Sequence, residues 1–283
     1  MTAQPPTALT IAGSDSGGGA GAQADLKTFL ACGVHGMSAI TAVTVQNSLG
    51  VTGFYELPPH AVAEQIESVA TDIGVGAAKT GMLASAEIMA AVAEAVRRLG
   101  IAPFVVDPVA ASQHGDPLLR PDAIETLREV IIPLATLITP NLGEVRLLTG
   151  IDVHARAEMA DAAKALHDLG PAWVLVKGGH LPGGDALDLL YDGSTFLELR
   201  SPRLATAHTH GSGDTLAAAI TAGLARGLDM PDAVRQGKRF ISRAVEDSFP
   251  LGAGLGPVGH FWRIRDWPES APGSGSAPDS APA

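Results

Sequence analysis

The segment "HTHGSGDTLAAAI", residues 208–220, places a carboxylate among small residues at the start of an apolar run. Gly211, Ser212 and Gly213 precede Asp214, and the Ala, Leu and Ile residues that follow predict a helix. Free backbone N–H groups at a helix start attract negative charge, so this turn could hold a phosphate. Asp214 then has two possible roles. It could cap the helix, since Asp is a favoured N-cap residue, or it could accept a proton beside the bound anion.

Further polar side chains stand at the ends of short apolar runs. The runs are "ALTIAGSD" with Ser14 and Asp15, "GAAKTGM" with Lys79, "FVVDP" with Asp107, "TLITPN" with Asn141, and "WVLVKGG" with Lys177 and Gly178. They alternate with amphipathic stretches, which predicts an α/β fold whose mostly parallel sheet is covered by helices on both faces. Ligands of such sheets bind outside the carboxyl ends of the strands. We therefore expect the polar residues to meet at one edge.

The elements that must position these residues can be placed by periodicity and by helix stop signals. Helices are predicted at about 21–31, 59–71, 85–99, 121–130, 143–149, 155–169, 214–226 and 231–247. The segment 214–226 is small and apolar nearly all round, which predicts a helix held inside the core. The stretch "ALDLLYDGSTFLELR" predicts a hairpin that turns at Asp192-Gly193.

Composition excludes several classes of protein. The net charge is -11 and no long run of Lys or Arg occurs, which argues against a nucleic-acid partner. No signal-peptide pattern and no window of ~20 apolar residues is present, so we expect a cytoplasmic protein with no membrane segment. Cys32 is the only cysteine and fits a buried structural position. Residues 1–267 are expected to form a single domain, and 268–283, rich in Pro, Ser, Gly and Ala, a disordered tail.

Three familiar motifs can be weighed against the residues. Gly17, Gly19 and Ala22 fit the dinucleotide pattern G-x-G-x-x-A, but no acidic residue lies between Asp25 and Glu56 to bind a ribose. The glycine density instead predicts a loop that closely approaches or covers a ligand. The Gly237-Lys238 pair lacks the P-loop context. The "HTH" spacing suits a metal, yet no Cys or His cluster completes a zinc site.

Hard oxygen ligands suited to Mg²⁺ stand at or just past strand ends: Asp107, Asn141 and Glu144. Their alternative role is capping and turn formation.

Several blocks together resemble one family. In order, "AGSDSGGGAGAQADLKTFLACGVHGMSAITAVTVQN", "KTGML", "VVDPV", "LITPNLGE", "VLVKGGH" and "THGSGDTLAAAI" resemble the hydroxymethylpyrimidine/phosphomethylpyrimidine kinases of thiamine biosynthesis, members of the ribokinase-like superfamily. The resemblance extends from about residue 8 to 262. It implies a ribokinase-like three-layer α/β/α sandwich, a homodimer, and an ATP- and Mg²⁺-dependent phosphotransferase.

The resemblance also implies roles on the substrate side. Gly13 and Asp25 would hydrogen-bond the hydroxymethylpyrimidine, and Met82 would pack on its ring. Gln46 would bind the ring nitrogen and amino group, because an amide offers both a donor and an acceptor.

On the nucleotide side, Glu144 with Asn141 would organise Mg²⁺ and the ATP phosphates, and Asp107 is a further candidate metal ligand from its position at a strand end. Lys177 and Gly178 would lie near the nucleotide. Gly211, Ser212 and Gly213 would form an anion hole, with Asp214 as the catalytic base.

Two departures from the family are visible. Many of these pyrimidine kinases carry Cys where this chain has Asp214, and the loop "AASQHGD", residues 110–116, lacks the usual Met and basic residue. The expected activity is phosphorylation of 4-amino-5-hydroxymethyl-2-methylpyrimidine and then of its monophosphate. Two alternatives stay open: a pyridoxal-type vitamin kinase and a non-catalytic vitamin or nucleotide sensor.

Overall fold

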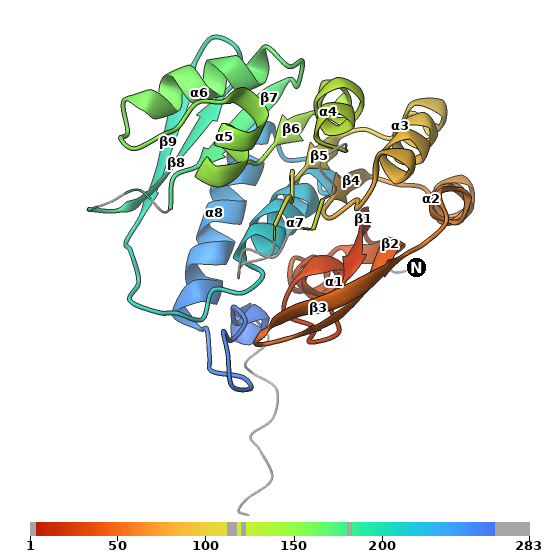
Figure 1. The fold of residues 1–283 in the computed structure, drawn as a ribbon, viewed down its shortest axis with the longest axis horizontal. Coiled ribbons are helices and arrows are strands. Elements are labelled where there is room, and N and C mark those ends of the chain that lie inside the picture. Colours follow the sequence, from red (N-terminus) through yellow and green to blue (C-terminus); the bar gives the residue numbers. More distant parts are fainter. Residues whose placement is uncertain (1–3, 112–117, 120–122, 180, 182, 264–283) are drawn as a thin grey trace, which may run out of the picture.

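The computed structural model describes residues 4–111, 118–119, 123–179, 181 and 183–263. The strands in this part are β1 (Thr7–Ser14), β2 (His35–Asn47), β3 (Gly50–Glu56), β4 (Ala77–Thr80), β5 (Phe104–Val106), β6 (Leu137–Ile138), β7 (Trp173–Lys177), β8 (Ala186–Tyr191) and β9 (Phe196–Ser201). They form one sheet in the order β3-β2-β1-β4-β5-β6-β7-β8-β9 (Figure 1). Neighbouring strands are parallel along the central part of the sheet, β2-β1-β4-β5-β6-β7. The pairs β2–β3, β7–β8 and β8–β9, toward the two edges, are antiparallel. The prediction of a mostly parallel sheet is confirmed.

The α-helices lie close to their predicted ranges. They are α1 (Gly21–Ala31), α2 (Pro59–Asp72), α3 (Ala86–Leu99), α4 (Ala123–Thr126), α5 (Leu142–Thr149), α6 (Glu158–His167), α7 (Ser212–Ala225) and α8 (Met230–Glu246). The predicted helix at 121–130 differs, because α4 passes into a short π-helix, Leu127–Ile131, and then a 3-10 helix, Ile132–Leu134, while residues 121–122 lie outside the described residues. A further 3-10 turn, His260–Arg263, follows α8.

Two hydrophobic cores lie on opposite faces of the sheet. Along β5, Phe104 and Val106 join one core and Val105 joins the other, since neighbouring strand residues point to opposite faces. Helices α2, α3, α5 and α6 cover the first face, and α1, α7 and α8 cover the second (Figure 1). This confirms the three-layer α/β/α arrangement that the family resemblance implies.

Helix α7 is enclosed, as its composition predicts. Every residue from Thr215 to Leu224 is buried. Small side chains permit this, because α8 packs closely along it: a Cβ at Gly237 would lie 2.5 Å from Ile220. The start of α7 is therefore held firmly at the carboxyl edge of the sheet.

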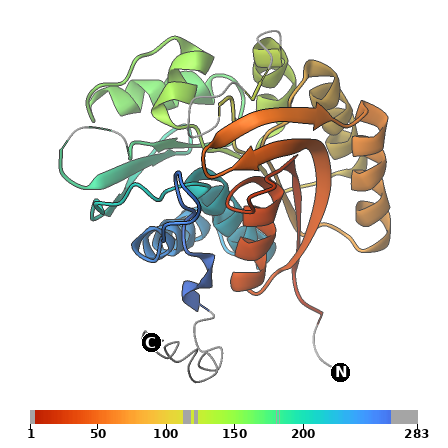
Figure 2. The ribbon, with the colours of Figure 1, turned by 60° about the horizontal axis from the view of Figure 1, so that its bottom comes forward.

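The hairpin β2–β3 has no counterpart among the strands predicted from apolar runs. It is the longest ribbon of the sheet and curves away from the other strands (Figure 2). The predicted β8–β9 hairpin is present, but its loop has four residues, 192–195, and Asp192 Oδ1 accepts the N–H groups of Ser194 and Thr195. Cys32 is buried at the end of α1, as expected.

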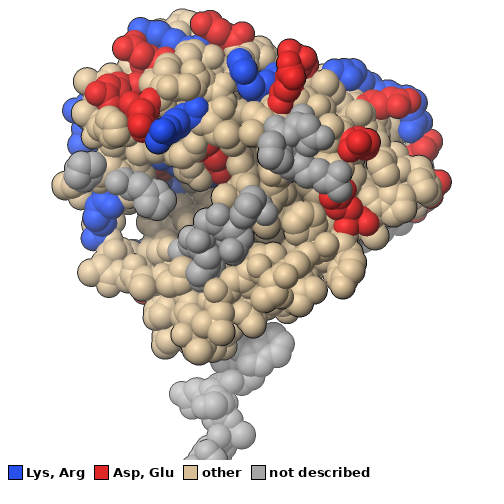
Figure 3. Space-filling view, in the orientation of Figure 1, with Lys and Arg blue, Asp and Glu red and all other residues tan. Residues whose placement is uncertain are grey.

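The surface mixes both signs of charge. On the face in Figure 3, Lys and Arg side chains stand among Asp and Glu side chains over the upper helices. Among the described residues, no helix is long and apolar enough to cross a membrane. The predicted tail, 268–283, lies outside the described residues.

Candidate active site

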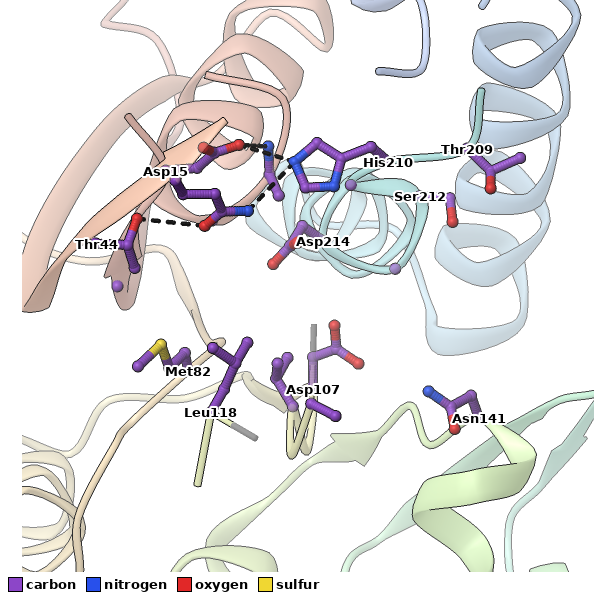
Figure 4. Close-up of a pocket in the computed structure, with 18 of the residues that line it drawn as sticks. Asp15, Thr44, Met82, Asp107, Leu118, Asn141, Thr209, His210, Ser212 and Asp214 are labelled. Carbon is purple, nitrogen blue, oxygen red and sulfur yellow. Dashed lines mark hydrogen bonds and ion pairs between the residues drawn. The ribbon is translucent and has the colours of Figure 1, made fainter. Parts of the chain in front are cut away.

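A cavity of about 390 Å³ opens at the predicted edge of the sheet (Figure 4). Its walls come from the ends of β1, β2, β5, β6 and β7, from the loop after β4, and from the start of α7. Met82 and Leu118 form an apolar side that faces His210 and Asp214 across the cavity (Figure 4). The cavity thus has one apolar wall and one wall rich in hydrogen-bonding groups.

The glycine-rich turn before α7 has the conformation that only glycine adopts readily. Gly211 is the N-cap residue, with φ of 76°, and a Cβ there would lie 1.9 Å from the Gly19 carbonyl oxygen. The glycines of loop 15–20 are therefore explained in part by close packing against this turn. Asp214 is the third residue of the helix and caps none of its N–H groups. The capping explanation for Asp214 is wrong, and its carboxylate points into the cavity (Figure 4).

A buried lysine lies behind Asp214. Lys79 Nζ is 2.9 Å from Asp25 Oδ1 and 3.4 Å from Asp214 Oδ1, and Thr10 Oγ1 donates to Asp25 Oδ2 at 2.6 Å. The Lys79 and Asp25 side chains are fully buried, whereas that of Asp214 is 17% exposed. Burial raises the pKa of Asp25 to about 7, a rise that Lys79 opposes and Asp214 reinforces. Burial alone would lower the pKa of Lys79, but Asp25 and Asp214 outweigh it and raise that pKa, so Lys79 is a cation.

The second charged group surrounds Lys177. Its Nζ is 2.9 Å from Asp107 Oδ1 and 3.9 Å from Glu144 Oε2. Asn141 and Glu144 form a capping box at the start of α5, in which each side chain accepts the other's backbone N–H. Burial raises the pKa of Glu144 to about 7, Lys177 opposes this, and Asp107 adds to it. The capping alternative is therefore true of Asn141 and Glu144, although both also line the cavity.

A third polar cluster lies at the end of β1. Asp15 accepts backbone N–H groups from Gly17, Gly19 and Ala20 and lies 2.9 Å from His210 Nε2. Burial raises the pKa of Asp15, but the His210 and backbone hydrogen bonds outweigh it, so that pKa is lowered. Gln46 joins the cluster from β2, with its Nε2 3.4 Å from His210 Nε2.

A second cavity of about 400 Å³ adjoins the first. The two share five lining residues: Asn141, Lys177, Thr209, Ser212 and Gly213. The second cavity extends toward β8, β9 and α8, where Lys238 and Asp188 pair at 2.7 Å. The shared residues place the start of α7 between the two cavities. A ligand in one cavity could therefore contact a ligand in the other at this point.

Most of the predicted site residues lie together. The first cavity is lined by Gly13, Gln46, Met82, Asp107, Asn141, Glu144, Lys177, Gly211, Ser212, Gly213 and Asp214. Gly13 can offer only its carbonyl group, because its N–H donates to the Met82 carbonyl at 3.2 Å. Asp25 lies behind the wall and reaches Asp214 only through Lys79. Gly178 lines neither cavity, and its N–H donates to β8.

Four residues of this site were not named as catalytic, substrate-binding, nucleotide-binding or metal residues from the sequence: Asp15, Thr44, Lys79 and His210. Asp15 and Lys79 carry a signal, since each lies at or just after the carboxyl end of a predicted strand. Thr44 carries none, because β2 was not predicted from its pattern. His210 precedes the glycine turn, and only the fold brings it to Asp15, 195 positions away.

The residues present suit a magnesium ion that is bound partly by protein carboxylates and partly by substrate phosphates. In the described part of the chain, no three His, Cys, Asp or Glu side chains converge as a metal cage. Asp107 and Glu144 stand beside Lys177, and both carboxylates line the first cavity. This suits Mg²⁺, which is commonly bound by one or two carboxylates together with substrate phosphates.

The chain matches known proteins over most of its length. Residues 15–259 match the phosphomethylpyrimidine kinase family. A hydroxymethylpyrimidine/phosphomethylpyrimidine kinase from Mycobacterium leprae is 57% identical over 260 residues, covering 90% of this chain and 93% of that protein.

Two solved structures share the fold. A phosphomethylpyrimidine kinase from Clostridium difficile has a TM-score of 0.76 and 43% identity, covering 84% of this chain and 99% of that one. A pyridoxal kinase from Staphylococcus aureus, in complex with AMP-PCP and pyridoxal, has a TM-score of 0.84 and 36% identity, covering 91% of this chain and 94% of that one. On the length of the family match and its identity to these enzymes, the chain belongs to the phosphomethylpyrimidine kinase family.

Proposed function

We propose that this chain phosphorylates 4-amino-5-hydroxymethyl-2-methylpyrimidine, and then the resulting monophosphate, with ATP as phosphoryl donor. The observation that carries the proposal is the meeting of two cavities at the start of α7, with Asp214 on the side of the first. An alcohol bound in the first cavity and a nucleotide bound in the second would meet there. The relatives named above are kinases of this kind.

The first cavity suits a small flat aminopyrimidine. Met82 and Leu118 offer an apolar wall for the ring. Gln46 offers an amide donor and acceptor to the ring nitrogen and amino group, and the Gly13 carbonyl is a further acceptor for the amino group. Asp25 is buried behind this wall, so we propose that it positions Lys79.

In the proposed reaction, the hydroxymethyl oxygen attacks the γ-phosphorus of ATP as the bond to the β,γ-bridging oxygen breaks. ADP leaves, and the hydroxyl proton passes to the Asp214 carboxylate. Lys79 contacts only one of the two oxygens of Asp214, Oδ1, which leaves Oδ2 for the substrate. Because the transition state of phosphoryl transfer is loose, the proton leaves late and a weak base suffices.

The transferring group is stabilised by the start of α7 and by Lys177. The Ser212 N–H donates to the Thr209 carbonyl at 3.1 Å, so the N–H groups of Gly211, Gly213 and Asp214 are the ones that would form the anion hole. Mg²⁺ bound with ATP would neutralise phosphate charge, and Asp107 and Glu144 are the side chains that would hold it. Asn141 positions Glu144 through the capping box.

Product analysis tests the proposal. The protein is incubated with the aminopyrimidine alcohol, ATP and Mg²⁺, and the mono- and diphosphate are resolved by mass spectrometry. Formation of both supports the proposal, whereas ADP formation without phosphorylated pyrimidine would refute it. Absence of any ATP turnover would favour a non-catalytic sensor.

A pyridoxal kinase activity is the second candidate, because the Staphylococcus aureus neighbour binds pyridoxal. Gln46 favours the pyrimidine, since its amide can pair with both the ring nitrogen and the amino group. A competition assay with both alcohols at equal concentration discriminates the two.

We also propose that residues 1–267 act as one kinase domain and assemble as a homodimer. Val43, Val45 and Tyr55 are exposed on the β2–β3 ribbon, where Val43 and Tyr55 are direct cross-strand partners. Apolar side chains of this kind are common at subunit interfaces. Light scattering on the purified protein measures the oligomeric state.

A further inference from the structure

Gln46 lies between two neighbours that each determine which way its amide must face. Its Nε2 is 3.4 Å from His210 Nε2, and its Oε1 is 3.2 Å from Thr44 Oγ1. A half-turn of the amide exchanges the nitrogen and oxygen without changing the shape of the side chain, so the correct orientation follows from the protons of the neighbours.

His210 Nε2 cannot accept a hydrogen bond from the Gln46 amide. Its Nε2 is 2.9 Å from Asp15 Oδ2, and that carboxylate also accepts three backbone N–H groups. An ionised carboxylate can only accept, so His210 Nε2 carries a proton whether the ring is neutral or charged. The lowered pKa of Asp15 agrees with this. An amide nitrogen facing His210 Nε2 would set one donor against another.

Thr44 requires a donor. Its Oγ1 is 2.7 Å from the Ser14 carbonyl oxygen, which can only accept, so the single hydroxyl proton lies on that bond. The lone pairs of Thr44 Oγ1 then face Gln46. An amide oxygen there would set one acceptor against another.

Both mismatches disappear with the same half-turn. We infer that His210 and Thr44 lock the Gln46 amide with Oε1 toward His210 and Nε2 toward Thr44, so that the site accepts an aminopyrimidine edge and rejects the oxopyrimidine edge of the same shape. Thr44, Gln46 and His210 all line the first cavity, where the remaining N–H and lone pair of the amide meet the ligand. This inference rests on the proposed function, because it names what selects the substrate at that site.

The chemical consequence concerns one ring edge. The aminopyrimidine presents a ring-nitrogen acceptor beside an amino donor, whereas the 4-oxo analogue presents a ring N–H donor beside a carbonyl acceptor. A freely turning amide pairs with either edge, but a locked amide pairs with only one. His210 and Thr44 are therefore positioning residues that determine specificity through Gln46.

The test compares the two analogues with wild type, His210→Phe, Thr44→Val and His208→Phe. Calorimetry measures binding of each analogue and turnover gives kcat/KM. His208 is the matched control, since its Nδ1 accepts the Gly256 N–H and it lies two residues from His210. Wild type and His208→Phe should prefer the amino analogue by about a hundredfold or more. His210→Phe and Thr44→Val should each reduce that preference by about tenfold, with KM for ATP unchanged.

Two further variants separate positioning from a structural contribution. His210→Gln, which can restore an N–H near the Nε2 position, should recover the preference. In a Gln46→Met background, His210→Phe should leave the ratio of the two analogues unaltered, because the lock then has nothing to hold.

Two results for His210→Phe would overturn the inference. One is an unchanged ratio of kcat/KM between the amino and oxo analogues, and the other is an equal loss of affinity for both analogues and for ATP. Should His210→Phe fail to fold, ¹⁵N NMR of wild type supplies the answer, since an unprotonated His210 Nε2 at neutral pH is incompatible with the lock. Wild type that binds the amino analogue selectively but does not phosphorylate it would refute the proposed function and leave the lock supported. Binding of neither analogue would refute both.

Discussion

Replacing Asp214 with Asn separates catalysis from folding. Asp214 caps no N–H group of α7, so the loss of its charge removes only the contact with Lys79 at 3.4 Å and a favourable position near the helix start. These contributions are offset in part, because Asp214 also repels Asp25 and raises the pKa of that carboxyl. We expect the free energy of unfolding to fall by no more than about 1–2 kcal/mol.

The rate should fall far more. Loss of a positioned base typically lowers kcat by about 10² to 10⁴, equivalent to about 3–5 kcal/mol in the barrier. The assay measures ADP release and pyrimidine phosphate formation at saturating substrates, and denaturant unfolding measures stability. Asp214→Cys, which introduces the residue that many pyrimidine kinases carry, should recover part of the loss. An Asn variant that turns over at nearly the wild-type rate would refute Asp214 as the base.

Four further outcomes are expected. Gln46→Met should weaken pyrimidine use by about 1–3 kcal/mol without altering KM for ATP, and an unchanged pyrimidine KM would contradict its placement in the substrate cavity. Lys79→Met should destabilise the fold by about 3–5 kcal/mol in urea, because Asp25 is left buried without its cation, and adding Asp25→Asn should restore much of that stability. The pKa of Glu144 is raised from 4.5 to about 7, so the folded chain holds a proton that the unfolded chain releases in this window, and this contribution to stability is lost as pH rises through about 7. Mg²⁺ binding favours the ionised carboxylate, so KM for Mg·ATP should fall between about pH 6 and about pH 8, and Glu144→Gln should remove that dependence. Deleting residues 269–283, which lie outside the described residues, should leave melting temperature and activity unchanged, and a large drop in melting temperature would show that the tail contributes to the fold.

The sequence by itself determined the layered architecture and the edge that carries the site. Apolar runs such as that of β5 have the length and flanking residues of buried strands, and polar residues such as Asp107 and Lys177 stand where those strands end. The apolar composition of 214–226 likewise predicted a buried α7. These features are local, because strand length, side-chain periodicity and helix stop signals all depend on near neighbours.

Only the tertiary structure decided which groups contact one another. The pairing of Lys79 with Asp25 and Asp214 joins positions 54 and 135 residues apart, and that of His210 with Asp15 joins positions 195 apart. The glycines of loop 15–20 suggested a ligand, yet part of their cause is the close approach of Gly19 to Gly211. The physical reason is that hydrogen bonds and ion pairs act over about 3–4 Å. Residues far apart in the sequence come within that distance only when whole helices and strands pack together, and local sequence patterns do not specify that packing.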